Sequence, residues 1–148
     1  MPIIDHEIAI NAPLEKIFNY VNKPSNLPQI WPSFIGVKNE ELLPNGGYRF
    51  EWMYKMGGVP LEGKAEYTDI VPNFWFSCKT YGAVDSKITW IFRSIGFQSR
   101  VILHIDYWVP SPTIGRLAES IVLEINEKEA ELILENLRKR CETSSEED

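Results

Sequence analysis

The segment from Ile10 to Ser33, INAPLEKIFNYVNKPSNLPQIWPS, restricts the fold of this chain more than any other stretch. The strand-like run before it stops at Asn11, a preferred helix-capping residue, and Pro13 suits the first turn of a helix. The apolar residues that follow are spaced for one helical face: Leu14, Ile17, Phe18 and Val21. This pattern predicts a short helix that begins at the Asn-Ala-Pro sequence.

Two prolines divide the rest of the segment. Because a proline disfavours helical geometry in the residue before it, the first helix must end before Pro24. A second short apolar turn runs from Leu27 to Trp31 and ends at Pro32. The segment therefore predicts one strand, two small helices and a return to strand.

The middle of the chain alternates apolar and polar residues between turns that contain glycine or proline. The apolar positions of three such runs are Tyr48, Phe50, Trp52 and Tyr54, then Ala65 and Tyr67, then Ile88, Trp90 and Phe92. A period of two with one polar side indicates an antiparallel sheet with one face in solvent and the other covered. We expect the charged residues of neighbouring strands to pair with one another on the solvated face.

A helical pattern from Thr113 to about Cys141 predicts the element that covers the sheet. Pro110 and Pro112 end the last strand and set the start of this helix. Its apolar positions are Ile114, Leu117, Ala118, Ile121, Ile125, Ala130, Leu134, Leu137 and Cys141. Such a helix would be roughly 40 Å long, enough to cross a sheet. We expect residues 1–141 to form a single domain and the acidic tail 142–148 to be disordered.

Length and composition exclude several classes of protein. The 148 residues suit one domain, and the formal net charge of −6 argues against binding to nucleic acid. No apolar run approaches the roughly 20 residues that span a bilayer, and no secretory signal is recognisable, so we expect a cytoplasmic protein. Cys78 and Cys141 lie far apart without metal-binding spacing, and we expect two reduced thiols.

Three stretches resemble the START-like (SRPBCC) superfamily, in particular its polyketide cyclase/dehydrase branch. They are INAPLEKIFNYV at the start, MGGVPLEGKAEYTDIVPN in the middle, and ITWIFRSIGFQSRVILHIDYWVP near the end. None of them is a catalytic signature. The resemblance implies an α+β helix-grip fold: a curved antiparallel sheet of about seven strands wraps around a long C-terminal helix, and two short helices follow the first strand. It also implies that a hydrophobic molecule is held between sheet and helix.

The face of the sheet opposite the charges is the candidate ligand-binding surface. Its residues are Phe50, Trp52, Tyr54, Tyr67, Phe76, Trp90, Phe92, Leu103, Ile105 and Tyr107. We expect Leu117, Ile121 and Ile125 of the helix to close the cavity and Trp31 to border its entrance. Each of these side chains could instead simply fill the core. As a set, apolar walls with a few hydroxyl groups are typical of a small-molecule pocket.

Few ionisable residues are expected to reach this cavity. Strand parity places Glu51, Glu62, Lys64, Glu66 and Arg93 on the solvated face. Asp69 either points inward or, as we favour, belongs to a turn. His6 is expected on the inner face, and His104 with Asp106 on the outer face, although pairing of the first and last strands could bring the two histidines close. Two histidines without a third ligand are weak evidence for a metal, so we expect neither metal nor cofactor and assign no catalytic residue.

Three functions fit these observations. The first is binding or transport of a hydrophobic or amphipathic small molecule, such as a lipid, a polyketide or a quinone-like aromatic. The second is a cyclase or dehydratase that acts on a polyketide-like substrate, with Tyr54, Tyr107 or His6 moving protons. The third is a protein-interaction module, since Ile102 and Trp108 make the outer face of the last strand apolar, and this face could equally be covered in a homodimer.

Overall fold

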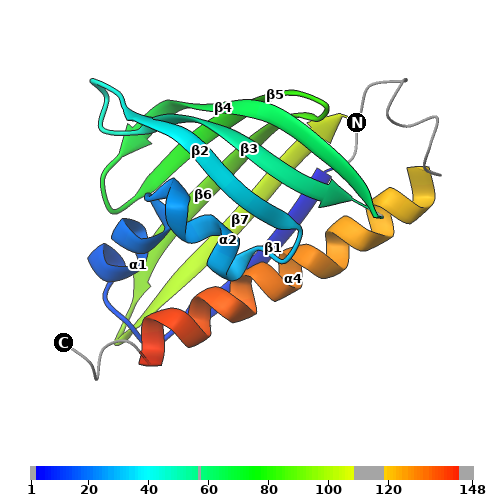
Figure 1. Cartoon of the computed structure of the whole chain (residues 1–148). Coiled ribbons are helices and arrows are strands. Elements are labelled where there is room, and N and C mark those ends of the chain that lie inside the picture. Colours follow the sequence, from blue (N-terminus) through cyan, green and yellow to red (C-terminus); the bar gives the residue numbers. More distant parts are fainter. Residues whose placement is uncertain (1–2, 57, 109–118, 144–148) are drawn as a thin grey trace.

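A seven-stranded antiparallel sheet curves around a long C-terminal helix (Figure 1). The computed structural model describes residues 3–56, 58–108 and 119–143, without the side chains of residues 56, 108, 119–126 and 143. The elements are β1 (Ile3–Ile10), α1 (Leu14–Val21), η1 (Pro24–Asn26), α2 (Leu27–Ile30), β2 (Phe34–Leu42), β3 (Tyr48–Met56), β4 (Val59–Val71), β5 (Trp75–Gly82), β6 (Asp85–Ile95), β7 (Gln98–Trp108) and α4 (Glu119–Thr143). The strand order is β1-β7-β6-β5-β4-β3-β2, which confirms the predicted helix-grip fold.

The two short helices form where the prolines predict them. Helix α1 ends at Val21, and the N–H of the cap residue Asn22 donates to the carbonyl of Phe18 at 2.8 Å. The expected capping by Asn11 is wrong, because Pro13 itself is the cap residue in extended geometry, with ψ of 148°. Asn11 instead donates its backbone N–H to the Glu142 carboxylate at 2.8 Å, so it ties the start of α1 to the end of α4.

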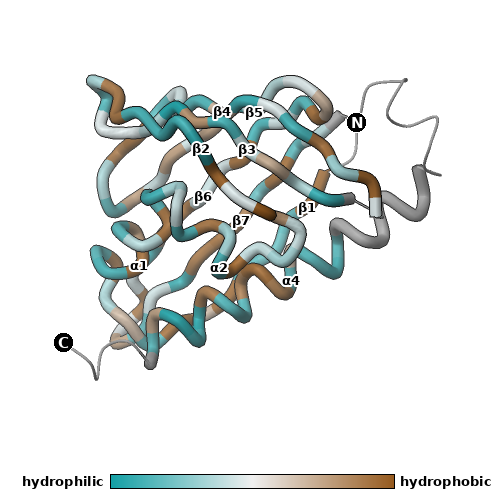
Figure 2. The backbone as a smooth tube through the Cα atoms, viewed as in Figure 1, coloured by the Kyte–Doolittle hydropathy of each residue, from teal (hydrophilic) through white to brown (hydrophobic). Residues whose placement is uncertain are grey.

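Buried residues of α1 and α4 cover the concave face of the sheet. Helix α1 contributes Ile17, Phe18 and Val21. The buried apolar residues described on α4 are Ala130, Ile133, Leu134, Leu137 and Cys141. Hydrophobic and hydrophilic segments alternate along the strands and along α4, as expected for elements with one covered side (Figure 2). The predicted apolar face of α4 is therefore correct over residues 130–141, with Ile133 added to it.

Charged side chains pair on the opposite, convex face of the sheet. Arg49 of β3 donates to Glu66 of β4 at 2.8 Å, and Arg100 of β7 lies 3.3 Å from Glu7 of β1. The imidazole of His104 lies on this face too, 2.6 Å from Asp5. Ile102 is half-buried there, while the side chain of Trp108 lies outside the described residues. The homodimer and the interaction module therefore stay predictions.

His6 and Asp69 do not reach the centre of the sheet-helix interface. The ring of His6 contacts Glu127 of α4, with 2.8 Å between Nε2 and Oε2, so it joins β1 to the helix. His6 pairs in register with Leu103 rather than with His104, which leaves the two histidines on opposite faces of neighbouring strands. Asp69 follows a bulge in β4 and is exposed, because the bulge shifts the strand's alternation by one residue.

Part of the predicted helix and tail lies outside the described residues. Residues 113–118, including the predicted helix start, and residues 144–148 of the acidic tail belong to this part. Within the described chain, α4 continues to Thr143, two residues past the expected domain end at Cys141. No helix in the described ranges combines the length and the apolar character needed to cross a membrane.

Both cysteines are free thiols in the interior. Cys78 lies on the inner face of β5, and Cys141 lies on the buried side of α4. Burial raises the pKa of the Cys78 thiol to about 12 and that of the Cys141 thiol to about 11. Both side chains therefore remain neutral, poorly nucleophilic thiols at neutral pH.

These raised pKa values predict a loss of stability in alkaline solution. In the unfolded chain both thiols ionise near pH 9. Above that pH the unfolded state binds fewer protons than the folded state, so the free energy of unfolding falls as the pH rises toward 12. Urea unfolding at pH 8 and pH 10.5 measures this fall, and we expect it to be smaller in Cys78→Ala. An equal fall in the parent and the variant would contradict the assignment.

Gly63 makes room for an aromatic ring on the inner face of the sheet. It pairs with Trp52 across β3 and β4, and the Trp52 indole N–H donates to the carbonyl of Lys64 at 3.1 Å. A Cβ atom on Gly63 would lie 2.2 Å from Cζ2 of Trp52 and 2.2 Å from the carbonyl oxygen of Tyr81. The indole can therefore occupy this position only over a glycine.

We predict that Gly63→Ala lowers the free energy of unfolding by about 3 kcal/mol, because the backbone or the indole must move. Gly36→Ala is the matched control: its added Cβ would meet only the end of the flexible Met53 side chain, at 3.1 Å. Chemical denaturation of the two variants tests the difference. Equal stabilities would show that the Trp52 ring is not constrained at Gly63.

Candidate functional site

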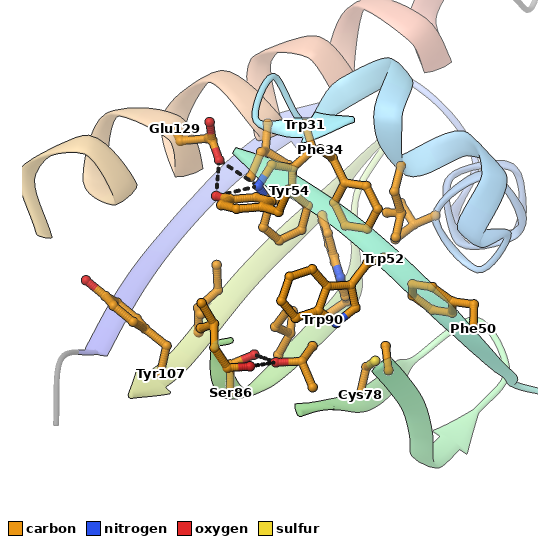
Figure 3. Close-up of a pocket in the computed structure, with 18 of the residues that line it drawn as sticks. Trp31, Phe34, Phe50, Trp52, Tyr54, Cys78, Ser86, Trp90, Tyr107 and Glu129 are labelled. Carbon is orange, nitrogen blue, oxygen red and sulfur yellow. Dashed lines mark hydrogen bonds between the residues drawn. The ribbon is translucent and has the colours of Figure 1, made fainter. Parts of the chain in front are cut away.

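A cavity of about 100 Å³ lies between the concave face of the sheet and the helices α2 and α4 (Figure 3). Its described lining residues are Ile4, Val21, Leu27, Trp31, Phe34, Phe50, Trp52, Tyr54, Ala65, Tyr67, Phe76, Cys78, Thr80, Val84, Ser86, Ile88, Trp90, Ile105, Tyr107, Glu129 and Ile133. Among them, Glu129 carries the only formal charge. The cavity exists because short helices and one long helix cannot fill the whole concavity of a seven-stranded sheet.

Aromatic rings on neighbouring strands support one another along the wall. The rings of Tyr67 and Phe76 are stacked with their centroids 4.8 Å apart and their planes 4° apart. Phe76 stacks in turn on Trp90, at 6.5 Å. Trp52 meets Tyr54 edge to face at 6.4 Å. Such pairs add stability beyond their buried area, so they fix the shape of the wall.

The structure brings most of the predicted site residues together around the cavity. Those in the lining are Trp31, Phe50, Trp52, Tyr54, Tyr67, Phe76, Trp90, Ile105 and Tyr107. Phe92 and Leu103 face the same side but lie in the closed core, outside the lining. For Phe92 the reason is α1, whose Phe18 packs edge to face on it at 5.5 Å. Leu117 and the side chains of Ile121 and Ile125 fall outside the described residues.

Glu129 places a carboxylate at the edge of this aromatic cavity. Its side chain comes from α4 and is buried. One oxygen, Oε1, accepts hydrogen bonds from the indole N–H of Trp31 at 2.8 Å and from the hydroxyl of Tyr54. The other, Oε2, accepts from the backbone N–H of Ser33 at 3.1 Å and from the Ser33 hydroxyl. Each carboxylate oxygen thus accepts two hydrogen bonds, the pattern of an acceptor-only group.

Burial and the nearby Glu129 carboxylate together keep the phenol of Tyr54 protonated. Burial, and next the neighbouring Glu129 charge, raise the pKa of the Tyr54 phenol above its usual value. Tyr54 therefore stays protonated, and its O–H group donates a hydrogen bond to the Glu129 carboxylate. Its oxygen accepts a second, longer hydrogen bond from the Trp31 indole at 3.3 Å.

Sequence reasoning missed Glu129 as a site residue. The predicted apolar stripe of the helix passed from Ile125 to Ala130 and left residue 129 unassigned. Yet Glu129 lies four residues after Ile125 and four before Ile133, and such positions share one helical face. A charged residue in an otherwise apolar stripe was the available signal.

A pair of hydroxyl groups forms a second polar feature of the lining. Thr80 of β5 and Ser86 of β6 are directly opposite in register, and their hydroxyl oxygens lie 2.5 Å apart. Thr80 also donates to the carbonyl of Val84 at 3.1 Å. Cys78 lies in the same wall, and the burial that raises the pKa of this thiol makes it a poor nucleophile.

The lining of the cavity is mostly apolar and has few polar groups. Within the described residues, no group of three histidine, cysteine, aspartate or glutamate side chains lies close enough to hold a metal ion. The lining provides apolar area, several rings, two hydroxyl groups at one place and one hydrogen-bonded carboxylate at another. Tyr54 and Glu129 are two ionisable groups of the lining that contact each other directly.

Comparison with known proteins is consistent with this geometry. Residues 1–142 match the family described as "Polyketide cyclase / dehydrase and lipid transport". Comparison with curated proteins gave no significant match.

Among solved structures, a protein from Thermus thermophilus has 23% sequence identity and a TM-score of 0.74, over 97% of this chain and 99% of that chain. The Zhui aromatase/cyclase from Streptomyces sp. R1128 has 13% identity and a TM-score of 0.80, over 97% and 95%. A START superfamily protein from Mycobacterium smegmatis has 14% identity and a TM-score of 0.79, over 95% and 97%. At these identities the likeness shows the fold alone. Because the family match spans nearly the whole sequence, the chain belongs to the family described as polyketide cyclase / dehydrase and lipid transport.

Proposed function

We propose that this protein binds a small, largely aromatic hydrophobic molecule in the cavity between the sheet and α4. The observation that carries the proposal is the lining itself, which is mostly aromatic and aliphatic and has its one carboxylate occupied by protein donors. Convergent apolar walls with a few fixed polar groups are typical of small-molecule sites. The family description, which names polyketide chemistry and lipid transport, supports a hydrophobic ligand in general terms.

The cavity volume favours a compact ligand over a long acyl chain. An apolar cavity of roughly 150 Å³ in another protein binds benzene. The volume of about 100 Å³ here is of the same order, so it suits a ligand on the scale of one ring. A longer polyketide or lipid would require the stacked rings of the wall to move.

Tryptophan fluorescence provides a direct test of binding. Trp31, Trp52 and Trp90 all line the cavity, so a bound aromatic molecule should quench or shift their emission. We expect saturable changes with toluene and p-cresol. Ala65→Phe should weaken binding at least tenfold, because the new ring would fill the space between β3 and β5, where Ala65 pairs with Phe50 and Thr80.

Ala9→Phe is the matched control, because Ala9 pairs with Arg100 on the outer side of β1 and lies outside the cavity lining. Circular dichroism checks that both variants fold. Binding that survives Ala65→Phe unchanged would place the ligand elsewhere. The absence of any response in the parent would contradict the proposed function.

The second candidate function is a cyclase-type enzyme, and the contact between Tyr54 and Glu129 favours it. A phenol that donates to a buried carboxylate at a cavity wall could pass a proton to or from a bound poly-β-keto chain. This function requires the parent to accelerate cyclisation of a short poly-β-keto thioester and Tyr54→Phe to abolish the acceleration. His6 contacts Glu127 and lies outside the cavity lining, so His6→Ala should have little effect.

Under the binding function, Glu129 anchors α4 rather than acting on a substrate. Glu129→Gln should then lower the free energy of unfolding by about 2 kcal/mol. The NH2 group of the new amide would face protein N–H and O–H groups that now donate to the carboxylate. Glu127→Gln, nearby on the same helix, removes only a partly exposed contact to His6 and should have a much smaller effect. Thermal or urea unfolding measures both. Equal stabilities of the two variants would contradict the anchoring role.

A further inference from the structure

We propose that the cavity selects an uncharged ligand that carries a hydroxyl group, and that this hydroxyl donates a hydrogen bond to Oγ of Ser86. The inference rests on the proposed binding function and specifies the ligand's chemistry. It follows from counting the hydrogens at the polar groups of the lining and from the position of the single charge.

The hydroxyl pair of β5 and β6 presents an acceptor to the cavity. A hydroxyl group has one hydrogen and two lone pairs. Thr80 uses its hydrogen on the carbonyl of Val84 at 3.1 Å. Because a carbonyl can only accept, we assign Ser86 as the donor and Thr80 as the acceptor in the 2.5 Å contact between the two hydroxyl oxygens. Ser86 has then used its own hydrogen, and it offers a ligand only lone pairs.

Four other polar groups of the lining use their hydrogens within the protein. The hydroxyl of Tyr54 and the indole of Trp31 donate to Glu129. Tyr67 donates to the carbonyl of Asn22 at 3.1 Å, and the indole of Trp52 donates to the carbonyl of Lys64. A ligand that brings its own donor can therefore be satisfied at Ser86, whereas a ligand that brings only acceptors meets few donors.

Trp90 is a lining residue that could favour the opposite ligand chemistry. Its indole N–H makes no hydrogen bond to any of the described residues, so it could serve an ether or carbonyl oxygen. Its ring packs beside Phe76 in the centre of the wall. The test must therefore include an acceptor-only ligand.

Charge excludes anionic ligands from the same cavity. The described lining contains a carboxylate, Glu129, and no lysine, arginine or histidine. A bound carboxylate would lose its hydration without meeting a cation, and it would be repelled by Glu129. Figure 3 places Ser86 and Glu129 on different sides of the aromatic residues, so a ring between them can direct a hydroxyl toward Ser86 and away from the carboxylate.

Four one-ring compounds that differ in a single substituent test this inference by calorimetric titration: p-cresol, toluene, 4-methylanisole and p-toluate. We expect p-cresol to bind about three- to tenfold more tightly than toluene, the effect of one hydrogen bond. 4-Methylanisole should show no gain over toluene, and p-toluate should bind at least tenfold more weakly. Ser86→Ala should reduce the affinity for p-cresol to that for toluene and leave toluene unchanged.

Two further variants control the design. Ser77→Ala removes a hydroxyl from a similar pair on the outer face of the same strands, where Ser77 and Thr89 lie 3.0 Å apart, so the preference for p-cresol should persist. Thr80→Val removes the acceptor of the Ser86 hydrogen. Ser86 can then donate to a ligand, and 4-methylanisole should gain affinity relative to the parent.

The outcomes separate this inference from the proposed function. Equal binding of p-cresol and toluene, or tighter binding of 4-methylanisole, would overturn the role of Ser86 and leave hydrophobic binding intact. Tight binding of p-toluate would overturn the argument from charge. If no compound of the series binds, the proposed function itself fails.

Discussion

The buried carboxylate of Glu129 is the interaction around which one end of the cavity is organised. A carboxylate removed from water is costly unless donors replace its hydration. Here the donors come from the segment between α2 and β2, through Trp31 and Ser33, and from β3, through Tyr54. A second polar contact, from Asn136 of α4 to the carbonyl of Ile30 at 3.0 Å, joins α4 to α2. The position of α2 over the sheet thus follows from polar contacts as well as from apolar packing.

The aromatic wall adds a second constraint, because its rings are not independent. Tyr67, Phe76 and Trp90 form a continuous stack across β4, β5 and β6. The indole of Trp52 packs directly on Gly63, because a side chain at that position would clash with the ring. A ring that moved to admit a larger guest would lose its neighbours' contacts, so the wall discriminates by shape. This rigidity makes a compact, flat ligand a better fit than a flexible chain.

Patterns of period two and of helical period predicted the fold from sequence, because burial on one side of a strand or helix leaves a direct trace in residue type. The parity of β3, β6 and β7 placed Trp52, Trp90 and Ile105 on the inner face. Two kinds of feature left no such trace. The first is the packing of the helices, which decides which inward residues line the cavity. Phe92 faces inward, but Phe18 of α1 packs on it, so Phe92 lies in the core. The second is a charged residue on an apolar helix face. Because periodicity was read from apolar residues alone, Glu129 was not recognised as part of the buried face.

The same hydrogen bonds that stabilise Glu129 oppose its use as a general base. A catalytic base must accept a proton from the substrate, and each oxygen of this carboxylate already accepts two hydrogen bonds from the protein. Tyr54 is protonated, because burial and the adjacent charge raise its pKa, so it can serve a substrate only as a donor that first leaves Glu129. Catalysis would therefore need a substrate that displaces one of these hydrogen-bond donors and itself donates a hydrogen bond to the carboxylate in its place. Binding requires no such exchange, since a ligand can occupy the cavity without displacing a partner of Glu129, and this difference makes binding the simpler consequence of the geometry.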